Sequence, residues 1–346
     1  MSGEILTREA YEAEEAERLS ARAALSSATR GRERPVSPDP YRTEYQRDRD
    51  RIIHCKAFRR LSHKTQVFLA PEGDHYRTRL THTLEVSQIA RSVARALRLN
   101  EDLTEAIALG HDLGHTPFGH IGEDALNDAL KVVRDEYPGV PYPFRHNRQS
   151  SRIVETLEYE GRGLNLTWEV RDGIRCHTGS TRAATLEGQI VAISDRVAYV
   201  NHDIDDAIRG GVITEEDLPD APCGVLGHTH AERITTMVQS LVEASAGADH
   251  VMMHDHIYKA MMDLRSFLFD NVYLSPHAKA EEPKAYAVVQ RLFQHYLANP
   301  GDLPEDERPE DEAHLVQAVT DYVSGMTDRF AIRTYERLMI PSRWRG

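Results

Sequence analysis

The segment His111-Asp112-Leu113-Gly114-His115 places two histidines and one aspartate within five residues. His111 and His115 are four positions apart, so on a helix they would share one face, and Asp112 would lie about 100° round from His111. Adjacent His and Asp side chains can both bind one metal ion if further ligands come from elsewhere in the chain. The chain holds three His-Asp dipeptides among 18 histidines, so the dipeptide indicates a site only together with its neighbours.

Two residues elsewhere in the chain are candidates for the missing ligands. His82 lies on an otherwise apolar helix, and Asp195 interrupts the apolar run 190–199, where a carboxylate is costly to bury unless a cation meets it. Alone, His82 fits a hydrogen-bonded helix histidine, and Asp195 fits a salt bridge with Arg196. A single metal ion explains both residues and the His111-Asp112 pair. Two His and two Asp ligands suit Mn, Fe, Co, Ni or Zn, with Mg a weaker fit.

The next segment, 116–123, combines glycines and a proline with His120 and Glu123. These residues predict a rigid turn that lets other groups approach the backbone closely. A carboxylate beside an imidazole raises the imidazole pKa and fixes its tautomer, which would make His120 a general acid supported by Glu123. The simpler interpretation is a helix start with an acid favoured by the helix dipole. His146, in the basic segment 144–150, is a further candidate, although it also fits a surface histidine.

A polar stripe and a basic segment suggest substrate contacts. Asp195, Tyr199 and Asp203 follow one another at four-residue steps on an otherwise apolar helix. The basic run 58–67, which includes Gln66, suits phosphates, though it fits a solvated face equally well. Six other histidines have no spacing that suggests a site, and we interpret them as structural: His177, His228, His230, His250, His254 and His256.

The elements that must position these residues are nearly all helices, since apolar residues recur at three- and four-residue steps. We expect an all-α fold with its main helices at 78–99, 100–115, 144–158 and 186–208, after a basic helical stretch at 41–61. A short hairpin is expected near 67–75, with loops at 138–145 and 300–313. We divide the chain into a polar, partly disordered N-terminal arm (1–35), a core (36–215) and a C-terminal helical region packed on that core (216–346).

The composition narrows the functional class. The chain has 346 residues and a net charge of −13, so it is a poor general nucleic-acid binder, and an anionic substrate would need a local basic patch or a metal. No apolar run approaches the roughly 20 residues of a membrane helix, and the N-terminus lacks the features of a signal peptide. Three scattered cysteines suggest no disulfide framework. We therefore expect a cytoplasmic protein without a membrane partner.

With these residues assembled, the sequence resembles the deoxyguanosine triphosphate triphosphohydrolase-like family of HD proteins. The resemblance covers about 41–273, and the segments that carry it occur in order: Phe58–Val67, Arg79–Val86, Gly110–Glu123, Phe144–Ser150, Asp195–Asp203 and Phe267–Tyr273. It implies an HD-domain helical bundle with additional C-terminal helices. It also implies hydrolysis of a deoxynucleoside triphosphate (dNTP) to the deoxynucleoside and inorganic triphosphate.

The resemblance assigns roles to individual residues. One divalent ion per site (Mn, Mg, Co or similar) would be held by His82, His111, Asp112 and Asp195. The catalytic shell would be His115, His120, Glu123 and His146. Gln66, Tyr199 and Asp203 would hold the deoxyribose, and Arg79 and Arg196 the phosphates. The implied partners are the dNTP substrate, a second dNTP as allosteric activator, and further copies of the chain in a tetramer or hexamer. Single-stranded DNA is a conceivable partner that the sequence does not indicate.

Two other interpretations stay open at this stage. The metal-binding residues alone would also suit an HD-type nucleotidase or phosphodiesterase that acts on a monophosphate or cyclic nucleotide. The pair of His120 and Glu123 favours the triphosphohydrolase, because expelling the 5′ oxygen as an alkoxide requires a proton. The third interpretation is a catalytically weak nucleotide sensor or single-strand-binding oligomer, and the intact set of ligands argues against it.

Overall fold

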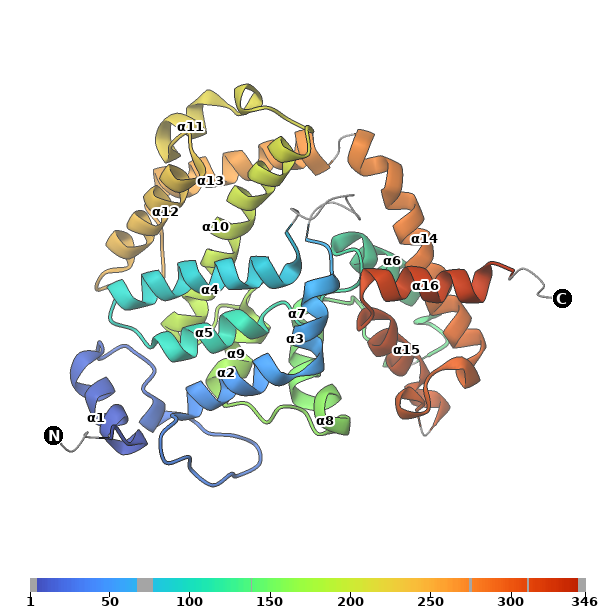
Figure 1. The fold of residues 1–346 in the computed structure, drawn as a ribbon, viewed down its shortest axis with the longest axis horizontal. Helices are drawn as coiled ribbons and strands as arrows, with labels where there is room; N and C mark the ends of the chain where they lie inside the picture. Colours follow the sequence, from blue (N-terminus) through green and yellow to red (C-terminus); the bar gives the residue numbers. More distant parts are fainter. Residues whose placement is uncertain (1–4, 67–76, 138, 274–275, 310, 342–346) are drawn as a thin grey trace.

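The computed structural model describes residues 5–66, 77–137, 139–273, 276–309 and 311–341, and these form helices joined by turns (Figure 1). The α-helices are α1 (Arg8–Arg18), α2 (Glu44–His54), α3 (Lys56–Arg60), α4 (Arg79–Ala96), α5 (Glu101–Gly110), α6 (His120–Val133), α7 (His146–Arg152), α8 (Glu158–Gly161), α9 (Trp168–Cys176), α10 (Leu186–Arg209), α11 (Asp220–Leu226), α12 (His230–Ser245), α13 (Asp255–Leu268), α14 (Pro276–Ala298), α15 (Leu315–Ser324) and α16 (Asp328–Met339). Among the described residues, the only β-type pairing is an isolated bridge between Thr65 and Thr78. The predicted all-α fold is confirmed.

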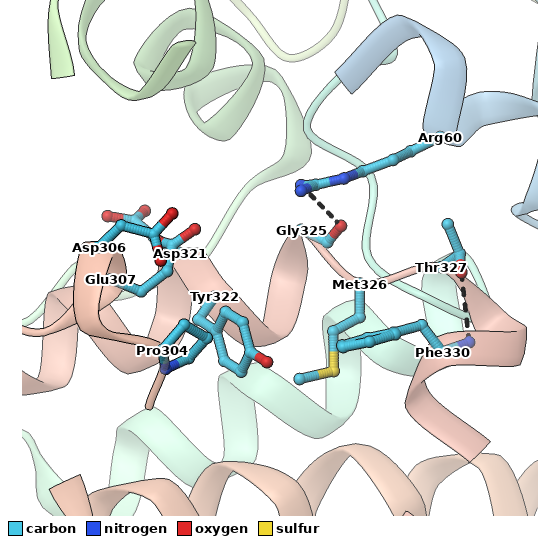
Figure 2. A pocket seen from close by; sticks show the side chains of 10 residues that line it. All are labelled: Arg60, Pro304, Asp306, Glu307, Asp321, Tyr322, Gly325, Met326, Thr327 and Phe330. Carbon is cyan, nitrogen blue, oxygen red and sulfur yellow. Dashed lines mark hydrogen bonds between the residues drawn. The ribbon is translucent and has the colours of Figure 1, made fainter. Parts of the chain in front are cut away.

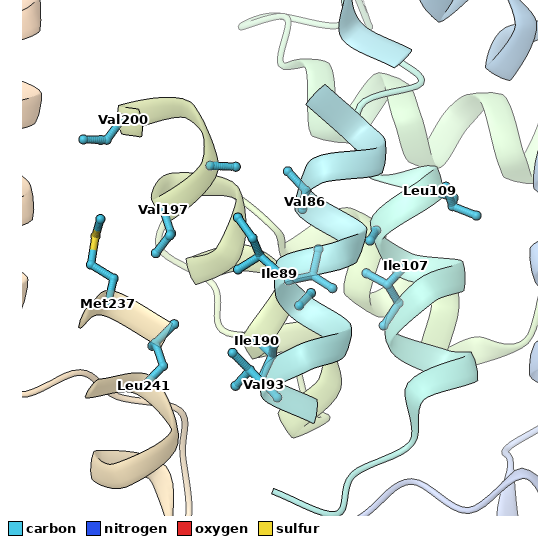
Figure 3. Packing of buried hydrophobic residues seen from close by; sticks show 14 of the residues in the cluster. Val86, Ile89, Val93, Ile107, Leu109, Ile190, Val197, Val200, Met237 and Leu241 are labelled. Atoms are coloured by element: carbon cyan, nitrogen blue, oxygen red, sulfur yellow. The ribbon is translucent and has the colours of Figure 1, made fainter. Parts of the chain in front are cut away.

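The larger hydrophobic core lies between α4, α5 and α10 and extends to α12 (Figure 3). On α4, the side chains of Val86, Ile89 and Val93 recur at three- and four-residue steps and are fully or almost fully buried. They form the apolar stripe that a core-facing helix requires. Ile107 of α5 and Ile190 of α10 are buried in the same cluster. The helices that carry His82, His111 and Asp195 are thus held by one continuous core.

A second hydrophobic cluster joins the C-terminal helices to α6. Leu126 and Leu130 of α6 are buried with Val289 and Phe293 of α14, and with Val319 of α15. In Figure 1, α14, α15 and α16 gather with α6 on one side of the molecule, whereas α11, α12 and α13 lie at the other side against α10. The C-terminal region therefore contributes to both clusters, and its last helices support the helix that begins at His120.

The N-terminal arm packs on the body of the protein. Glu15 of α1 is 2% exposed, and its carboxylate accepts hydrogen bonds from Ser26 N and Oγ, both 3.0 Å away, and from Asn100 Nδ2 at 3.1 Å. Asn100 also caps α5 by accepting from Leu103 N at 3.1 Å. A buried carboxylate is stabilised by several donors of this kind. From Thr7 onward the arm is therefore an ordered part of the fold, where we had expected it to be partly disordered.

Helix ends match the expectations in some places and differ in others. The predicted helices 78–99 and 186–208 correspond to α4 and α10, and α10 ends at Arg209, directly before Gly210. The predicted helix 100–115 is shorter, because α5 ends at Gly110. The predicted helix 144–158 becomes α7 followed by a π-helical turn over Ile153–Leu157. The hairpin expected near 67–75 lies outside the described residues. Among the described helices, none is both long and apolar enough to cross a membrane.

Candidate active site

The turn after α5 is fixed by α7, which packs directly against it. The hydroxyl of Ser150 donates to the carbonyl of His111 at 2.6 Å and accepts from the backbone N–H of Gly114 at 2.9 Å. It thereby satisfies two backbone groups that the end of a helix leaves unpaired. A Cβ at Gly114 would lie 2.2 Å from Ser150 N and 2.4 Å from His146 O. Only glycine permits this approach, which brings His146 to the His-Asp segment.

The second turn, 116–119, also depends on glycine. Gly119 has φ +60°, a conformation that residues with a Cβ rarely adopt. Thr116 Oγ1 donates to Gly119 O at 2.6 Å. A Cβ at Gly122 would lie 2.1 Å from Pro117 O. The predicted rigid turn with close backbone approach is what the structure shows, and it sets the position at which α6 starts with His120.

The four predicted metal ligands come together from α4, the turn after α5, and α10. His111 donates its Nδ1–H to Ala108 O at 2.7 Å, so the Nε2 of its ring carries a lone pair. That Nε2 is buried without a hydrogen-bond partner, 3.5 Å from Asp112 Oδ1 and 3.8 Å from Asp195 Oδ1. His82 Nε2 lies 3.0 Å from Asp195 Oδ1. Ligand atoms of His82, His111 and Asp112 all lie within 4.8 Å of one another.

This arrangement fits a divalent ion. Neighbouring ligands about 2.1 Å from a metal lie roughly 3.0–3.4 Å apart, close to the separations observed between these atoms. An imidazole lone pair that faces two carboxylate oxygens is repelled unless a cation lies between them. Burial raises the pKa of Asp112, but its neighbours His111, His115 and Arg79 lower it well below its usual value. Burial likewise opposes the ionisation of Asp195, yet His82 and His111 hold its pKa at about 2. Both carboxylates are therefore ionised and available as ligands.

Arg79 is engaged with a predicted metal ligand. Its guanidinium Nη1 donates to Asp112 Oδ2 at 2.8 Å, and both side chains are buried. The pair leaves Asp112 Oδ1 facing His111 and His115. The structure places Arg79 where it orients Asp112 and balances its charge. Its role in binding phosphates stays a prediction.

The predicted catalytic histidines line the same space. The rings of His115 and His146 are stacked, with centroids 4.0 Å apart, and His120 lies edge-on to both, at 5.5 and 6.2 Å. The Glu123 carboxylate accepts from His146 Nδ1 at 2.9 Å. We had expected Glu123 to support His120. Glu123 lies in the first turn of α6, and its side chain points towards His146 of α7 instead.

The pKa of His120 depends on the groups packed around its ring, although the residue as a whole is exposed at the start of α6. Desolvation of its ring in the site lowers its pKa, the charges of Arg79 and His146 lower it further, and Glu123 opposes them only in part. His120 is therefore neutral near pH 7 in the absence of substrate, contrary to the raised pKa that its sequence neighbourhood suggested.

Two of the predicted deoxyribose residues carry a buried side-chain oxygen without a partner. Gln66 Oε1 and Asp203 Oδ1 are buried without a hydrogen-bond partner. Tyr273 donates its hydroxyl proton to the other oxygen of Asp203, and Arg265 donates to the hydroxyl of Tyr199 at 2.7 Å. Within the described residues, Arg196 has no hydrogen bond or salt bridge. Unpaired buried oxygens of this kind are suited to a ligand that brings donors.

Sequence reasoning missed His177, which we had interpreted as structural. It lies at the end of α9 and is 2% exposed. Its Nε2 is 3.3 Å from His146 Nε2 and 3.8 Å from Asp112 Oδ1. No spacing in the sequence indicates this, because α9 reaches the site through tertiary packing alone. His202 is a further buried histidine nearby, with its ring 6.1 Å from that of His82 and its Nδ1 3.0 Å from Glu85.

A pocket of about 330 Å³ lies elsewhere, between α3 and the C-terminal helices (Figure 2). Its walls are lined by Arg60, Pro304, Asp306, Glu307, Asp321, Tyr322, Gly325, Met326, Thr327 and Phe330. Arg60 reaches the C-terminal segment across this pocket and donates to Gly325 O at 3.2 Å, the contact drawn as a dashed line in Figure 2. None of the predicted site residues lines this pocket, so the chemistry is assigned to the histidine cluster.

Comparison with known proteins agrees with this geometry. Residues 79–200 match the HD domain, and residues 251–337 match the phosphohydrolase-associated domain. The chain is 55% identical over 338 residues to a deoxyguanosinetriphosphate triphosphohydrolase-like protein from Caldanaerobacter subterraneus subsp. tengcongensis, covering 97% of each chain. It is 47% identical to a protein of the same name from Desulfatibacillum aliphaticivorans, covering 97% of this chain and 98% of that one.

A solved structure of a hypothetical protein from Aquifex aeolicus is a more distant match. It has 20% sequence identity and a TM-score of 0.45, and the match covers 84% of this chain and 71% of that chain. The family assignment therefore comes from the sequence relatives, which match nearly end to end. The chain belongs to the deoxyguanosinetriphosphate triphosphohydrolase-like family and is a phosphohydrolase of the HD type.

Proposed function

We propose that this HD phosphohydrolase hydrolyses deoxynucleoside triphosphates to the deoxynucleoside and inorganic triphosphate. The observation that carries the proposal is one cluster in which the metal ligands adjoin the imidazoles of His115, His120 and His146. A site that breaks the bond between the 5′ oxygen and the α-phosphorus must balance phosphate charge and also protonate a poor leaving group. This cluster offers groups for both tasks.

His82, His111, Asp112 and Asp195 would hold the divalent ion. When bound, the ion would neutralise charge on the α-phosphate and lower the pKa of a water molecule. Arg79 keeps Asp112 ionised and oriented through their 2.8 Å contact. Arg196, which has no partner among the described residues, is available to the outer phosphates.

His120 is the proposed proton donor to the 5′ oxygen. It is exposed at the start of α6, where an incoming substrate can reach it. Its pKa is lowered in the structure as it stands, but a triphosphate carries several negative charges that raise the pKa of a nearby imidazole. Substrate binding would thus favour the protonated form of His120, which can then donate its proton. Glu123 acts on the neighbouring His146, whose tautomer and ring orientation it fixes.

The sugar would lie against α10. Gln66 and Asp203 each present a buried oxygen without a partner, which a 3′-hydroxyl can satisfy by donating. Tyr199 is fixed by Arg265 and forms the wall that we propose excludes a 2′-hydroxyl. These assignments make deoxynucleotides the preferred substrates over ribonucleotides.

Product analysis tests the proposal. Each dNTP, alone and in pairs, would be incubated with the protein and Mg, Mn or Co, and the products separated by ion-exchange chromatography. The expected result is deoxynucleoside and triphosphate in a 1:1 ratio, with no product from the His111→Ala variant. Release of pyrophosphate, or of orthophosphate from a monophosphate, would overturn it in favour of a nucleotidase or phosphodiesterase. Equal rates for wild type and His111→Ala would favour a non-enzymatic nucleotide sensor.

A further inference from the structure

The helix that begins with His146 is short and depends on its neighbours for its position. α7 has 7 residues, and a π-helical turn over Ile153–Leu157 follows it directly. A helix of this length is not stable in water by itself, so tertiary contacts must hold it in place. The hydroxyl of Ser150 ties it to the turn after α5, and Glu123 binds His146 at its first residue. A third anchor lies on its last turn.

One carboxylate of α15 provides this third anchor. Asp321 is 7% exposed, and its Oδ1 accepts from Gln149 Nε2 at 2.9 Å. Arg152 donates through Nε to both carboxylate oxygens at 2.8 Å, and its Nη2 lies 2.7 Å from Oδ2. Arginine pairs of this forked kind fix geometry as well as adding energy. Because two residues on one face of α7 converge on the same carboxylate, Asp321 restricts the rotation of α7 about its axis.

We propose that Asp321 is a positioning residue for His146, and that the phosphohydrolase-associated domain thereby completes the active site of the HD domain. Asp321 lies within residues 251–337, which match the associated domain, whereas α7 lies within the HD match, 79–200. A displacement of about 1 Å in a site can cost roughly 100-fold in rate, so a support outside the site affects the reaction. The inference rests on the proposed function for the part that His146 plays in the reaction.

Fold stability alone is the competing explanation for this cluster. Asp321 also accepts from Gln317 Nε2 at 2.9 Å, and a buried carboxylate is stabilised by every donor that it meets. The contacts differ in where they lead. The bond from Gln317 stays within α15, whereas the bonds from Gln149 and Arg152 end on the helix that begins with His146. The two kinds of contact can therefore be removed separately.

Steady-state kinetics on the best dNTP separates the two explanations. Gln149→Leu and Arg152→Gln each remove a donor on α7, and Asp321→Asn removes the charge that both donors face. Each variant is expected to lower kcat about 10-fold, as for other groups that orient site histidines, with little change in KM. The double variant of Arg152→Gln and Asp321→Asn should lose no more than either single variant, because the two residues act through one contact.

The matched control is Gln317→Leu. It removes a bond of the same length to the same carboxylate oxygen, but it leaves both contacts with α7 in place, so it should keep the kcat of wild type. Circular dichroism and thermal unfolding would verify that each variant is folded at the assay temperature. If Asp321→Asn does not fold, Gln149→Leu against Gln317→Leu carries the comparison.

Nuclear magnetic resonance of protein labelled with ¹⁵N-histidine tests the same contact without any substrate. The nitrogen shifts of an imidazole report its tautomer, and the signals of His146 would be assigned with His146→Gln. Wild type and Gln317→Leu should show His146 protonated on Nδ1, as its contact with Glu123 requires. Asp321→Asn and Gln149→Leu should show a mixture of tautomers, because a displaced α7 loosens that contact.

The two measurements distinguish a failure of the positioning role from a failure of the proposed function. If wild type hydrolyses no dNTP but the tautomer of His146 responds as expected, the positioning role stands and the proposed reaction is wrong. An unchanged tautomer of His146 in folded Asp321→Asn and Gln149→Leu overturns the positioning role. In an active enzyme, equal kcat for these variants and Gln317→Leu overturns it as well.

Discussion

The Glu123 carboxylate binds Nδ1 of His146 at 2.9 Å, although His120 precedes it by three residues on the same helix. Burial raises the pKa of Glu123, but its hydrogen bond with His146 lowers it on balance. The carboxylate is therefore ionised and holds His146 with Nε2 directed at His177. Glu123 is thus a positioning residue for His146.

Replacing Glu123 by glutamine should lower kcat about 10- to 100-fold, the usual cost of losing the outer partner of a site histidine. The amide keeps the size of the side chain but loses its charge, so KM should change little. The measurement is steady-state kinetics on the best dNTP. Asp124→Asn is the matched control, since Asp124 is the next residue on α6 and is exposed. Equal kcat for Glu123→Gln and Asp124→Asn would contradict the assignment.

Removal of the metal site proposed at His111 and its neighbours should abolish activity. His111→Ala deletes the unpartnered Nε2 that faces two carboxylates, and a metal ion contributes several kcal/mol to such a reaction. A loss of about 10³-fold or more is expected. Chelator should inactivate wild type to the same extent, and Mn²⁺ or Co²⁺ should restore wild type but not the variant. His63→Ala, at an exposed histidine, should behave as wild type. Full activity in chelator-treated protein would exclude a metal-dependent reaction.

Asp203 should make stability depend on pH. Burial raises the pKa of its carboxyl from 3.8 to about 7, with Tyr273 opposing. Because folding favours the protonated form, the stabilising contribution is complete below pH 3.8 and is lost as the pH rises towards 7. Asp203→Asn lacks this titration, so its stability relative to wild type should increase between pH 4 and 7, by on the order of 4 kcal/mol, and level off above.

Urea unfolding of wild type and Asp203→Asn across this range measures the difference. Asp263→Asn, at an exposed position on α13, serves as the control and should follow wild type at every pH. A constant difference between Asp203→Asn and wild type would refute the prediction. The same variant should raise KM for dNTPs, because Asp203 Oδ1 is a proposed acceptor for the sugar hydroxyl.

Asp328 should support activity from a distance. Its carboxylate accepts from Phe118 N at 3.0 Å and from Thr65 N at 2.9 Å, so it holds the turn that precedes His120. Asp328→Ala leaves these N–H groups unpaired, which should cost about 1–3 kcal/mol of stability and lower kcat. Thermal unfolding and kinetics would be compared with Glu336→Ala, an exposed acid on the same helix. Wild-type values for Asp328→Ala would show that the turn keeps its position without α16.

Much of the site could be predicted because its signals are local. Asn100 caps α5, as an asparagine directly before an apolar helix commonly does. Asp195 interrupts an apolar run, and a buried carboxylate needs a cation; the structure places it beside His82 and His111. Gly119 and Gly122 signalled a turn in which other groups approach the backbone closely, and the structure shows this close approach. In each case, the neighbouring residues in the sequence showed that the residue would be unfavourable at its position without a special role.

The remaining features depend on contacts between distant segments. His177 lies 65 residues after Asp112 and 18 residues before Asp195. These separations form no recognisable pattern, because α9 is brought to the site by the core. The partner of Glu123 could not be predicted from the sequence. Its three-residue spacing from His120 suggested that histidine, whereas the fold brings His146 to it. Arg79 is one residue among 42 Lys and Arg, and only the fold shows that it is paired with Asp112.

Lys64 is buried, and its Nζ donates to His115 O and to Ser324 O, the latter 3.1 Å away. Together with Asp328, it ties the His-Asp turn to residues that lie more than a hundred positions beyond the HD match, which ends at residue 200. Residues 79–200 therefore do not contain all the contacts that hold the site in shape. A graft of residues 79–200 into another scaffold would carry His82, His111, Asp112 and Asp195. It would leave behind the groups of α15 and α16 that hold the turns around these residues in place.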